Sequence, residues 1–436
     1  MGLFNYLTLF KILFFGQCFN LLQLGAQLSD YSNFPVNDHI IQSRINNPHS
    51  QTSNISERQS RYREDKNCKA LKEREPNSFL SDTMSLARIE LEMKNYPPRF
   101  EFGSQRLLIM ESLDKIIDFS VRDDNRDEIK LKEIVSFYQR QVDQGLSKLE
   151  KIKVSVGVHI FKFYSSSLIL KSADGTIAID FCQGPVGNDY KLESYDNEGE
   201  PEKSDYFKTG FYMTNEQRDR LAKLVDVYII THPHQDHVDY SLAKRMIQEG
   251  KPVIGPEQLT YKWSDLSRDI IVPSYNEVQK FGPCEIFSQS GYQYKRGKKL
   301  DNGEFYGIPT RYLSHDVESI RYLIKIGGII FLHSAETQAE AYMWLELAKS
   351  LGWNADVLVS AGMWQGERSV MKFLKDNQVN CFYLPVHEYE MTHGAGGQRS
   401  APGLKGENRK TFDRKMLMNL LWGEDFILTK QMLNQK

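Results

Sequence analysis

Residues 225–255 constrain the fold more than any other stretch, because they join a strand, a histidine-rich loop and a helix. Residues 225–230 (VDVYII) are mostly β-branched or aromatic, which is typical of a buried strand. Asp239 can cap the helix that follows, whose apolar residues recur at helical spacing. The loop is therefore expected at the end of a rigid strand, a common place for functional residues. It carries, within six residues, three histidines and one aspartate: His232, His234, Asp236 and His237.

The amino terminus is expected to be a targeting segment. Residues 3–24 are mostly apolar, and Gly25-Ala26 supplies the small residues of a cleavage site, so residues 1–26 are predicted to be a secretory signal peptide. The alternative is an N-terminal membrane anchor, although the glutamines and asparagine among them make a poor span. The predicted location is secreted or periplasmic, with no stable membrane span after signal removal. Residues 27–75 are strongly polar and are predicted to form a flexible leader.

The charge and cysteine patterns exclude some partners. A formal net charge of -2 gives no electrostatic basis for nucleic-acid binding, so a small-molecule or lipid-like substrate is expected instead. The five cysteines include no CxxC pair, which argues against a zinc–thiolate finger. Cys182 and Cys381 lie in strand-like apolar runs and are expected in the core.

Residues 76–151 show helical periodicity. Leu86, Ile89 and Met93 fall on one face, Pro97-Pro98 interrupts the pattern, and apolar residues recur at spacings of three or four through residues 131–149. We predict two or three helices that precede the main domain. They either pack on that domain or help an oligomer to form.

Residues 152–436 alternate between strands and helices, which predicts an α/β domain. Gly327-Gly328 joins two strand-like runs and is typical of a tight hairpin turn. Apolar residues at helical spacing predict helices over residues 341–351 and around residues 370–374. Two β-rich halves, each with helices, favour a layered α/β/β/α sandwich. The predicted strands are residues 154–158, 160–164, 167–171, 176–180, 320–326, 329–333, 357–360 and 379–386.

The histidine loop has the chemistry of a metal site. Neutral imidazoles at the first two positions of an HxHxDH loop can converge on one ion, while the aspartate and last histidine turn toward a second. Nitrogen and carboxylate ligands suit Zn²⁺, with Mn²⁺ or Fe as alternatives. The loop supplies too few ligands for two closed sites. His315, Glu336 and His387 are placed on later parts of the chain to complete them.

The loop is similar to the HxHxDH signature of the metallo-β-lactamase superfamily. The likeness extends to four further segments: residues 176–180 (TIAID), 314–316 (SHD), 330–337 (IFLHSAET) and 384–387 (LPVH). Together they cover roughly residues 154–426. The resemblance implies a four-layer αββα sandwich, preceded here by the helical segment and the leader.

The resemblance also implies how the metals would be shared. One ion would take His232, His234 and His315, and the other would take Asp236, His237 and His387. Glu336 would bridge both ions, a departure because the family normally has aspartate there, and His333 or Asp316 are its substitutes. His393 competes with His387 for the last position. Asp180 is expected to orient a ligand histidine rather than to bind metal itself.

The ligand set favours a metal-dependent hydrolase. Two metals would hold a bridging hydroxide as the nucleophile, and Asp236 is expected to orient it. Residues 231–237 (THPHQDH) resemble branches of the superfamily that contain an ascorbate-phosphate lactonase and a phospholipase D acting on N-acyl phosphatidylethanolamines. A lactone or a phosphodiester is therefore the expected substrate, with a β-lactam or a thioester as alternatives. The alternative is a catalytically altered metal-binding or interaction protein on the same fold, which the unusual Glu336 favours.

Overall fold

The structure is a computed structural model, and its described residues all belong to the compact unit Thr83–Lys436. The predicted signal peptide and leader lie outside them. No helix in this part of the chain combines the length and the apolar character needed to cross a bilayer. The described residues are 84–102, 105–106, 108–110, 112–113, 116, 128–182, 213–233, 237–294, 298–299, 305–306, 317–335, 348–360, 381–386, 418 and 420–434.

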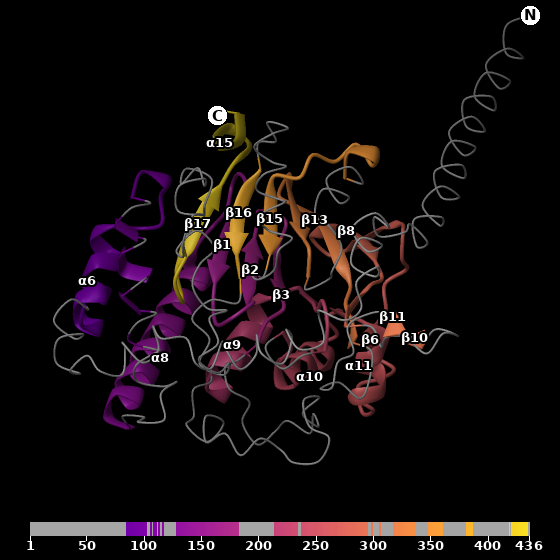
Figure 1. The fold of residues 1–436 in the computed structure, drawn as a ribbon, viewed down its shortest axis with the longest axis horizontal. Coiled ribbons are helices and arrows are strands. Elements are labelled where there is room, and N and C mark those ends of the chain that lie inside the picture. Colours follow the sequence, from indigo (N-terminus) through magenta and orange to yellow (C-terminus); the bar gives the residue numbers. More distant parts are fainter. Residues whose placement is uncertain are drawn as a thin grey trace, which may run out of the picture. The chain divides into compact units, whose positions relative to one another are not determined.

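A seven-stranded mixed sheet carries the histidine loop (Figure 1). Its first four strands in spatial order pair antiparallel, whereas β3 to β6 run parallel, so the carboxyl ends of β3 and β4 lie at the same edge. In that order the strands are β17 (Asp425–Leu428), β1 (Val158–Lys162), β2 (Leu168–Lys171), β3 (Thr176–Ile179), β4 (Val227–Ile229), β5 (Val253–Ile254) and β6 (Ile270–Ile271).

A six-stranded mixed sheet packs against the first. Its order is β16 (Phe382–Pro385), β15 (Val357–Ser360), β14 (Ile329–His333), β13 (Arg321–Ile326), β8 (Cys284–Gln289) and β7 (Val278–Phe281). The first three of these are parallel and the others antiparallel. Two short pairs accompany them: β9 (Tyr292–Tyr294) with β12 (Val317–Glu318), and β10 (Lys298–Lys299) with β11 (Phe305–Tyr306).

Two hydrophobic cores separate the layers. Alternate residues of a strand point to opposite faces, so Ile177 and Ile179 enter the core between the sheets while Ala178 faces the helices. The two cores confirm the predicted α/β sandwich. Its fourth layer, expected from residues 341–351 and 370–374, lies largely outside the described residues. The described helices are α6 (Leu86–Asn95), η2 (Phe100–Phe102), α8 (Glu128–Lys151), α9 (Asn215–Leu224), α10 (Tyr240–Gln248), α11 (Glu257–Lys262) and α15 (Lys430–Asn434).

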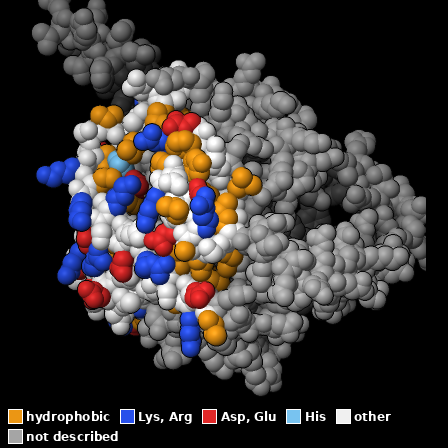
Figure 2. Space-filling model, turned by 90° about the vertical axis from the view of Figure 1, so that its left-hand side faces the viewer, with side chains coloured by type: hydrophobic (Ala, Val, Ile, Leu, Met, Phe, Trp, Pro, Cys, Tyr) orange, Lys and Arg blue, Asp and Glu red, His pale blue; other side chains and the backbone are white. Residues whose placement is uncertain are grey.

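The helices before the sheets pack on the first sheet. Ile89 of α6 and Tyr138 of α8 share a core with Phe161 of β1. Buried Arg106 strengthens this contact, because its guanidinium forms an ion pair with Glu424 and donates to the backbone oxygen of Tyr96 over 2.9 Å. Their outward side mixes both signs of charge with apolar side chains (Figure 2). Of the two predicted roles for these helices, packing on the sandwich is the one observed.

Local sequence chemistry determines several element ends. A threonine followed three residues later by glutamine, as at Thr214 and Gln217, predicts a capping box at the start of a helix. The structure confirms it for α9: the Thr214 hydroxyl accepts from the Gln217 backbone N–H, and the Gln217 side chain accepts from the Thr214 backbone N–H. Asp239 caps α10 as predicted. The first predicted strand, residues 154–158, is wrong: the chain bends there, Gly157 has a φ of 76°, and β1 begins only at Val158. Strands β6 to β12 and β17 were not anticipated.

The sheets touch directly at both ends of the sandwich. At one end a Cβ added to Gly327, in the β13–β14 turn, would lie 2.6 Å from the backbone oxygen of Gly157. At the other end the Ile320 N–H donates to the Thr231 oxygen over 2.8 Å, and the Tyr322 hydroxyl donates to the Ile230 oxygen over 3.1 Å. The second sheet therefore holds the segment that leads into the histidine loop.

Candidate metal centre

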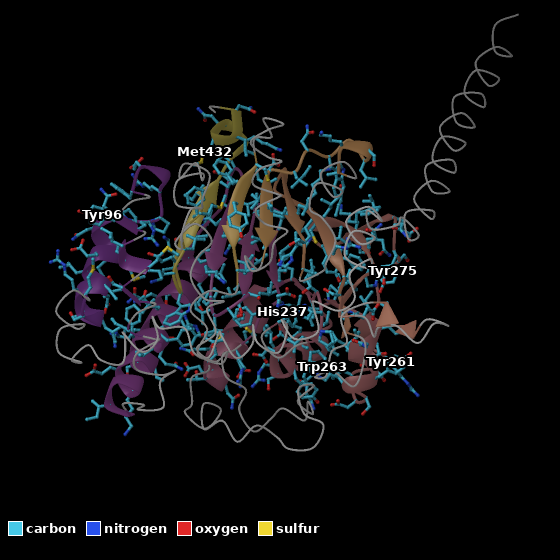
Figure 3. All side chains as sticks on the ribbon, in the orientation of Figure 1. Tyr96, His237, Tyr261, Trp263, Tyr275 and Met432 are labelled. Atoms are coloured by element: carbon cyan, nitrogen blue, oxygen red, sulfur yellow. The ribbon has the colours of Figure 1, made fainter. Side chains whose placement is uncertain are left out.

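The structure describes two of the seven predicted metal ligands and brings them together. His232 and His237 begin and end the loop after β4, and their ring centroids lie 3.8 Å apart. Both side chains are buried. In Figure 3, His237 lies near the middle of the side chains that are drawn. The other predicted ligands lie outside the described residues: His234, Asp236, His315, Glu336 and His387, together with the substitutes Asp316 and His393.

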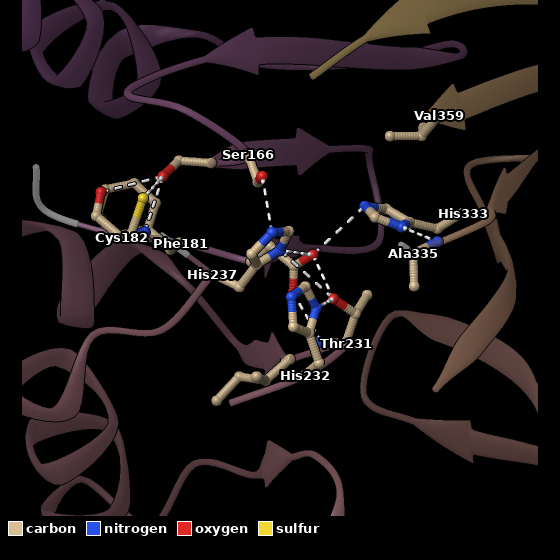
Figure 4. A network of polar contacts seen from close by, with 12 residues as sticks. Ser166, Phe181, Cys182, Thr231, His232, His237, His333, Ala335 and Val359 are labelled. Atoms are coloured by element: carbon tan, nitrogen blue, oxygen red, sulfur yellow. Dashed lines mark hydrogen bonds and ion pairs between the residues drawn. The ribbon is translucent and has the colours of Figure 1, made fainter. Parts of the chain in front are cut away.

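Buried Asp180 contacts Thr231, His237 and His333, three residues of the polar cluster that Figure 4 shows. It follows β3, next to the end of the parallel strand β4, and one of its oxygens, Oδ1, accepts from the Thr231 N–H over 2.7 Å. Its other oxygen, Oδ2, accepts from the Thr231 hydroxyl over 2.6 Å and lies 2.8 Å from Nδ1 of His237. The expected contact between Asp180 and a histidine of the loop is therefore present.

These contacts determine where the protons lie on both histidines. An ionised carboxylate only accepts, so Asp180 takes the Nδ1–H of His237 and the hydroxyl hydrogen of Thr231. The Thr231 oxygen then accepts from Nδ1 of His232, 3.0 Å away. Each imidazole is left with its lone pair on Nε2, which is the form that binds a metal.

The charge of Asp180 is maintained by its neighbours. Burial alone would raise its pKa, but the electrostatic interaction and hydrogen bond with His237, the interaction with His333 and the hydrogen bond from Thr231 outweigh burial and hold the pKa below its ordinary value. Asp180 is therefore ionised at neutral pH.

His333 reaches the same cluster from the second sheet. It ends β14, is buried, and places Nε2 3.6 Å from Oδ2 of Asp180. Its Nδ1 accepts from the backbone N–H of Ala335 over 3.1 Å. From the sequence, His333 was a substitute for Glu336, a core residue or a residue that supports the ligands, and the structure places it buried beside Asp180.

Two hydroxyl groups of the site were not anticipated. The Ser166 oxygen, in the turn between β1 and β2, lies 3.4 Å from Nε2 of His237. The Thr231 hydroxyl connects Asp180 with His232. For Thr231 the signal was its place between a strand and a histidine. Ser166 gave only a weak signal, a serine run between two predicted strands.

A second buried network fixes the loop from its flanks. The Tyr228 hydroxyl donates to the backbone oxygen of Phe181 over 2.6 Å and accepts from the Asp239 N–H over 3.0 Å. Asp239 also lies 3.7 Å from Nε of buried Arg218. Burial raises the pKa of Asp239, although the Arg218 guanidinium opposes the rise. Tyr228 thus joins the segment after Asp180 to the segment after His237.

The described donors suit a divalent cation but do not by themselves complete a site. Among the residues that the structure describes, no three His, Cys, Asp or Glu side chains gather as a metal-binding group. His232 and His237 nevertheless offer two adjacent, buried imidazoles whose Nδ1 atoms are already engaged. Nitrogen donors fixed in this way fit Zn²⁺ and related ions.

Comparison with known proteins gives structural likenesses only. No family model and no curated protein matches the sequence. A "possible metal-dependent hydrolase" from Veillonella parvula is similar at 13% identity and a TM-score of 0.45, over 63% of this chain and 100% of that one. An isothiocyanate hydrolase from Delia radicum gut bacteria is similar at 12% identity and a TM-score of 0.42, over 62% and 99%. The metallo-β-lactamase fold protein YhfI from Bacillus subtilis is similar at 14% identity and a TM-score of 0.36, over 63% and 99%.

These likenesses carry no conclusion about what this chain does. Its own topology is that of an α/β sandwich of two mixed sheets, with a histidine loop at the carboxyl ends of two parallel strands. That arrangement agrees with the resemblance of the sequence to the metallo-β-lactamase superfamily.

Proposed function

We propose that this chain is a metal-dependent hydrolase with two divalent cations, most simply Zn²⁺, with Mn²⁺ or Fe as alternatives. The observation that carries the proposal is the pair of buried, adjacent imidazoles, His232 and His237, whose Nδ1 atoms contact the Thr231 hydroxyl and the Asp180 carboxylate. Metal-binding histidines are regularly oriented by a carboxylate or hydroxyl on the other ring nitrogen, and here two adjacent imidazoles in one loop are both oriented in this way.

The ligands proposed for the two ions are those of the sequence resemblance. His232, His234 and His315 would hold one ion, Asp236, His237 and His387 would hold the other, and Glu336 would bridge them. When bound, such ions lower the pKa of a water molecule toward neutrality and polarise a carbonyl or phosphoryl oxygen.

The protein's own part in the reaction is to keep the donors in one protonation state. Asp180 retains the proton on Nδ1 of His237, and Thr231 relays the same constraint to His232. Asp236 is proposed to orient the attacking water. Because Asp180 and Thr231 are buried, bulk water does not compete for these hydrogen bonds.

The substrate is proposed to be a small or lipid-like molecule with a hydrolysable lactone or phosphodiester bond. The near-zero net charge favours such a substrate over nucleic acid. Loops around a metal site, rather than the metal loop itself, select among these substrates, so both bond types are to be tested.

Metal content and hydrolysis together test the proposal. Protein purified without chelator should contain metal, and His232→Ala should lose most of it. Lactone and phosphodiester reporters should show turnover that His237→Ala abolishes. His159→Ala is the matched control, because His159 is also buried and also pairs with an aspartate, 3.1 Å away.

Two results would contradict the proposal. Metal content near zero in the wild type would remove its basis. Bound metal without turnover of either reporter would favour the alternative, a metal-binding protein without hydrolytic activity.

A further inference from the structure

The turn between β1 and β2 is a buried, strained segment. It lies at the metal edge of the first sheet, which is the edge where β3 and β4 end and where Asp180 and His237 lie. Ser165, Ser166 and Ser167 are each 0% exposed, which is unusual for three consecutive hydroxyl side chains. Ser165 has a φ of 50°, in the left-handed region that residues with a side chain seldom adopt. Such strain persists where the surrounding structure enforces it, and it is concentrated at ligand-binding sites.

Hydrogen bonds on one side of the turn enforce this geometry. The Ser167 hydroxyl accepts from the Cys182 N–H over 2.7 Å and donates to the Cys182 oxygen over 3.0 Å. The turn is thereby fixed to the segment that follows Asp180. Ser166 then projects its hydroxyl toward the ring of His237 (Figure 4).

The distance between Ser166 and His237 suits two ligands of one ion better than a hydrogen bond. Their Oγ and Nε2 atoms are 3.4 Å apart, whereas a hydrogen bond donated by a hydroxyl is usually shorter, about 2.5–3.0 Å to oxygen. Two donors bound tetrahedrally to one Zn²⁺ at about 2.1 Å lie about 3.4 Å from each other. The lone pair of Nε2 is on the ring edge that faces Ser166, because Asp180 holds the proton on Nδ1.

We infer that Ser166 supplies a hydroxyl oxygen to the coordination sphere of the cation bound by His237. This inference rests on the proposed function, since it requires a metal at His237. It adds to the expected ligands a residue that lies 71 positions before His237 in the chain. The strained Ser165 and the anchored Ser167 act as positioning residues for it.

A thiol at position 166 gives the direct test. Cobalt(II) bound by a thiolate has a charge-transfer absorption in the near ultraviolet, which cobalt bound by nitrogen and oxygen ligands lacks. Full-length Ser166→Cys protein loaded with Co²⁺ should show this band, and the wild type should not, although Cys182, Cys284 and Cys381 are present as free thiols. Ser167→Cys is the matched control, because the Ser167 side chain is equally buried but forms hydrogen bonds with the backbone of Cys182.

The outcomes separate this inference from the proposed function. If the wild type binds no Co²⁺, both are overturned. If the wild type and Ser166→Cys both show the visible absorption of bound Co²⁺, and the variant has no charge-transfer band, only the role of Ser166 is overturned.

A second pair of variants keeps the test valid if the thiol disturbs folding. Ser166→Ala should weaken Co²⁺ binding about 10-fold in competition with a chelator, whereas Ser166→Thr, which keeps the hydroxyl, should restore most of the affinity. Circular dichroism and the thermal midpoint of the metal-free proteins check that each is folded. Equal Co²⁺ affinity in Ser166→Ala and wild type would contradict the inference.

Discussion

Among the described residues, two buried aspartate–histidine pairs lie within or at the edge of the first sheet, and their surroundings differ. Asp180 lies 2.8 Å from Nδ1 of His237, and Asp425 lies 3.1 Å from Nδ1 of His159. His159 is within β1, where its ring stacks on Phe161 with centroids 6.4 Å apart. His237 is in a loop at the strand ends, beside a second histidine and a serine hydroxyl. An aspartate–histidine pair therefore does not mark a site by itself, because its position in the sheet determines what the other ring nitrogen can meet.

The charge balance of the two carboxylates differs as well. Asp425 forms an ion pair with Lys148 of α8 as well as a hydrogen bond with His159. The described partners of Asp180 are Thr231, His237 and His333, with no lysine or arginine among them. A buried carboxylate without a fixed cationic partner favours a bound cation nearby, whereas Asp425 already has one.

The largest difference between the two pairs is expected in metal affinity when each aspartate is replaced in turn. In Asp180→Asn the amide can donate to Nδ1 of His237, which moves the ring proton to Nε2 and blocks the metal side. Metal affinity, measured by chelator competition, should fall about 10- to 100-fold. Asp425→Asn is the control and should leave the affinity unchanged. Equal losses in both variants would remove the distinction between the pairs.

The Tyr228 hydroxyl, in the network beside the histidine loop, should contribute more to the free energy of unfolding than an ordinary tyrosine hydroxyl does. Tyr228→Phe leaves the Asp239 N–H and the Phe181 oxygen without their buried partner, so the free energy of unfolding should fall by about 1–3 kcal/mol. Tyr275→Phe removes a half-buried hydrogen bond to Glu318 and should cost about 1 kcal/mol or less. Denaturant unfolding of both variants measures the difference. A larger loss in Tyr275→Phe would count against a special role for Tyr228.

The pair of Asp425 and His159 should affect the free energy of unfolding and its dependence on pH. Burial alone would raise the pKa of Asp425, but hydrogen bonds from His159 and Lys148 outweigh it and hold the pKa below its ordinary value. Its contribution is therefore complete above the unfolded pKa of about 4 and is lost as the pH falls through the folded value. Asp425→Asn should lower the free energy of unfolding at pH 7 by about 1–2 kcal/mol. Urea unfolding should show this difference shrinking below about pH 4, and a constant difference would contradict the pairing.

The smallest effect is expected from Lys148 itself. Its side chain is 53% exposed, so water and salt screen its ion pair with Asp425. Lys148→Met should change the free energy of unfolding by about 0–1 kcal/mol and leave metal binding unaltered. Chemical denaturation at low and high salt measures it. A loss as large as that of Asp425→Asn would mean that Lys148, rather than His159, balances the carboxylate.

The sequence predicted the parts of the fold that depend on near neighbours. The capping box of Thr214 and Gln217, the cap at Asp239 and the turn at Gly327-Gly328 all involve residues within a few positions of one another. β17 could not be found in this way. It has four residues, its burial does not alternate, and it is stabilised by pairing with β1 from the opposite end of the sandwich domain.

The site was predictable to the same extent. His232 and His237 belong to one loop, and Asp180 was expected from the strand that it ends. The serine contact was not predictable, because it depends on a backbone turn with φ of 50° at Ser165 and on a partner 71 residues away. The approach of His333 to Asp180 depends on how the two sheets pack, which no local pattern encodes.

The hydrogen bond from the Ile320 N–H to the Thr231 oxygen reports how often the second sheet separates from the end of β4. The Ile320 amide proton can exchange with deuterated solvent only when the second sheet withdraws from the end of β4. Thr231 also holds Asp180 through its N–H and its hydroxyl, so the same excursion would disturb the carboxylate. The protection factor of one backbone amide thus measures the free energy that keeps the whole histidine cluster assembled.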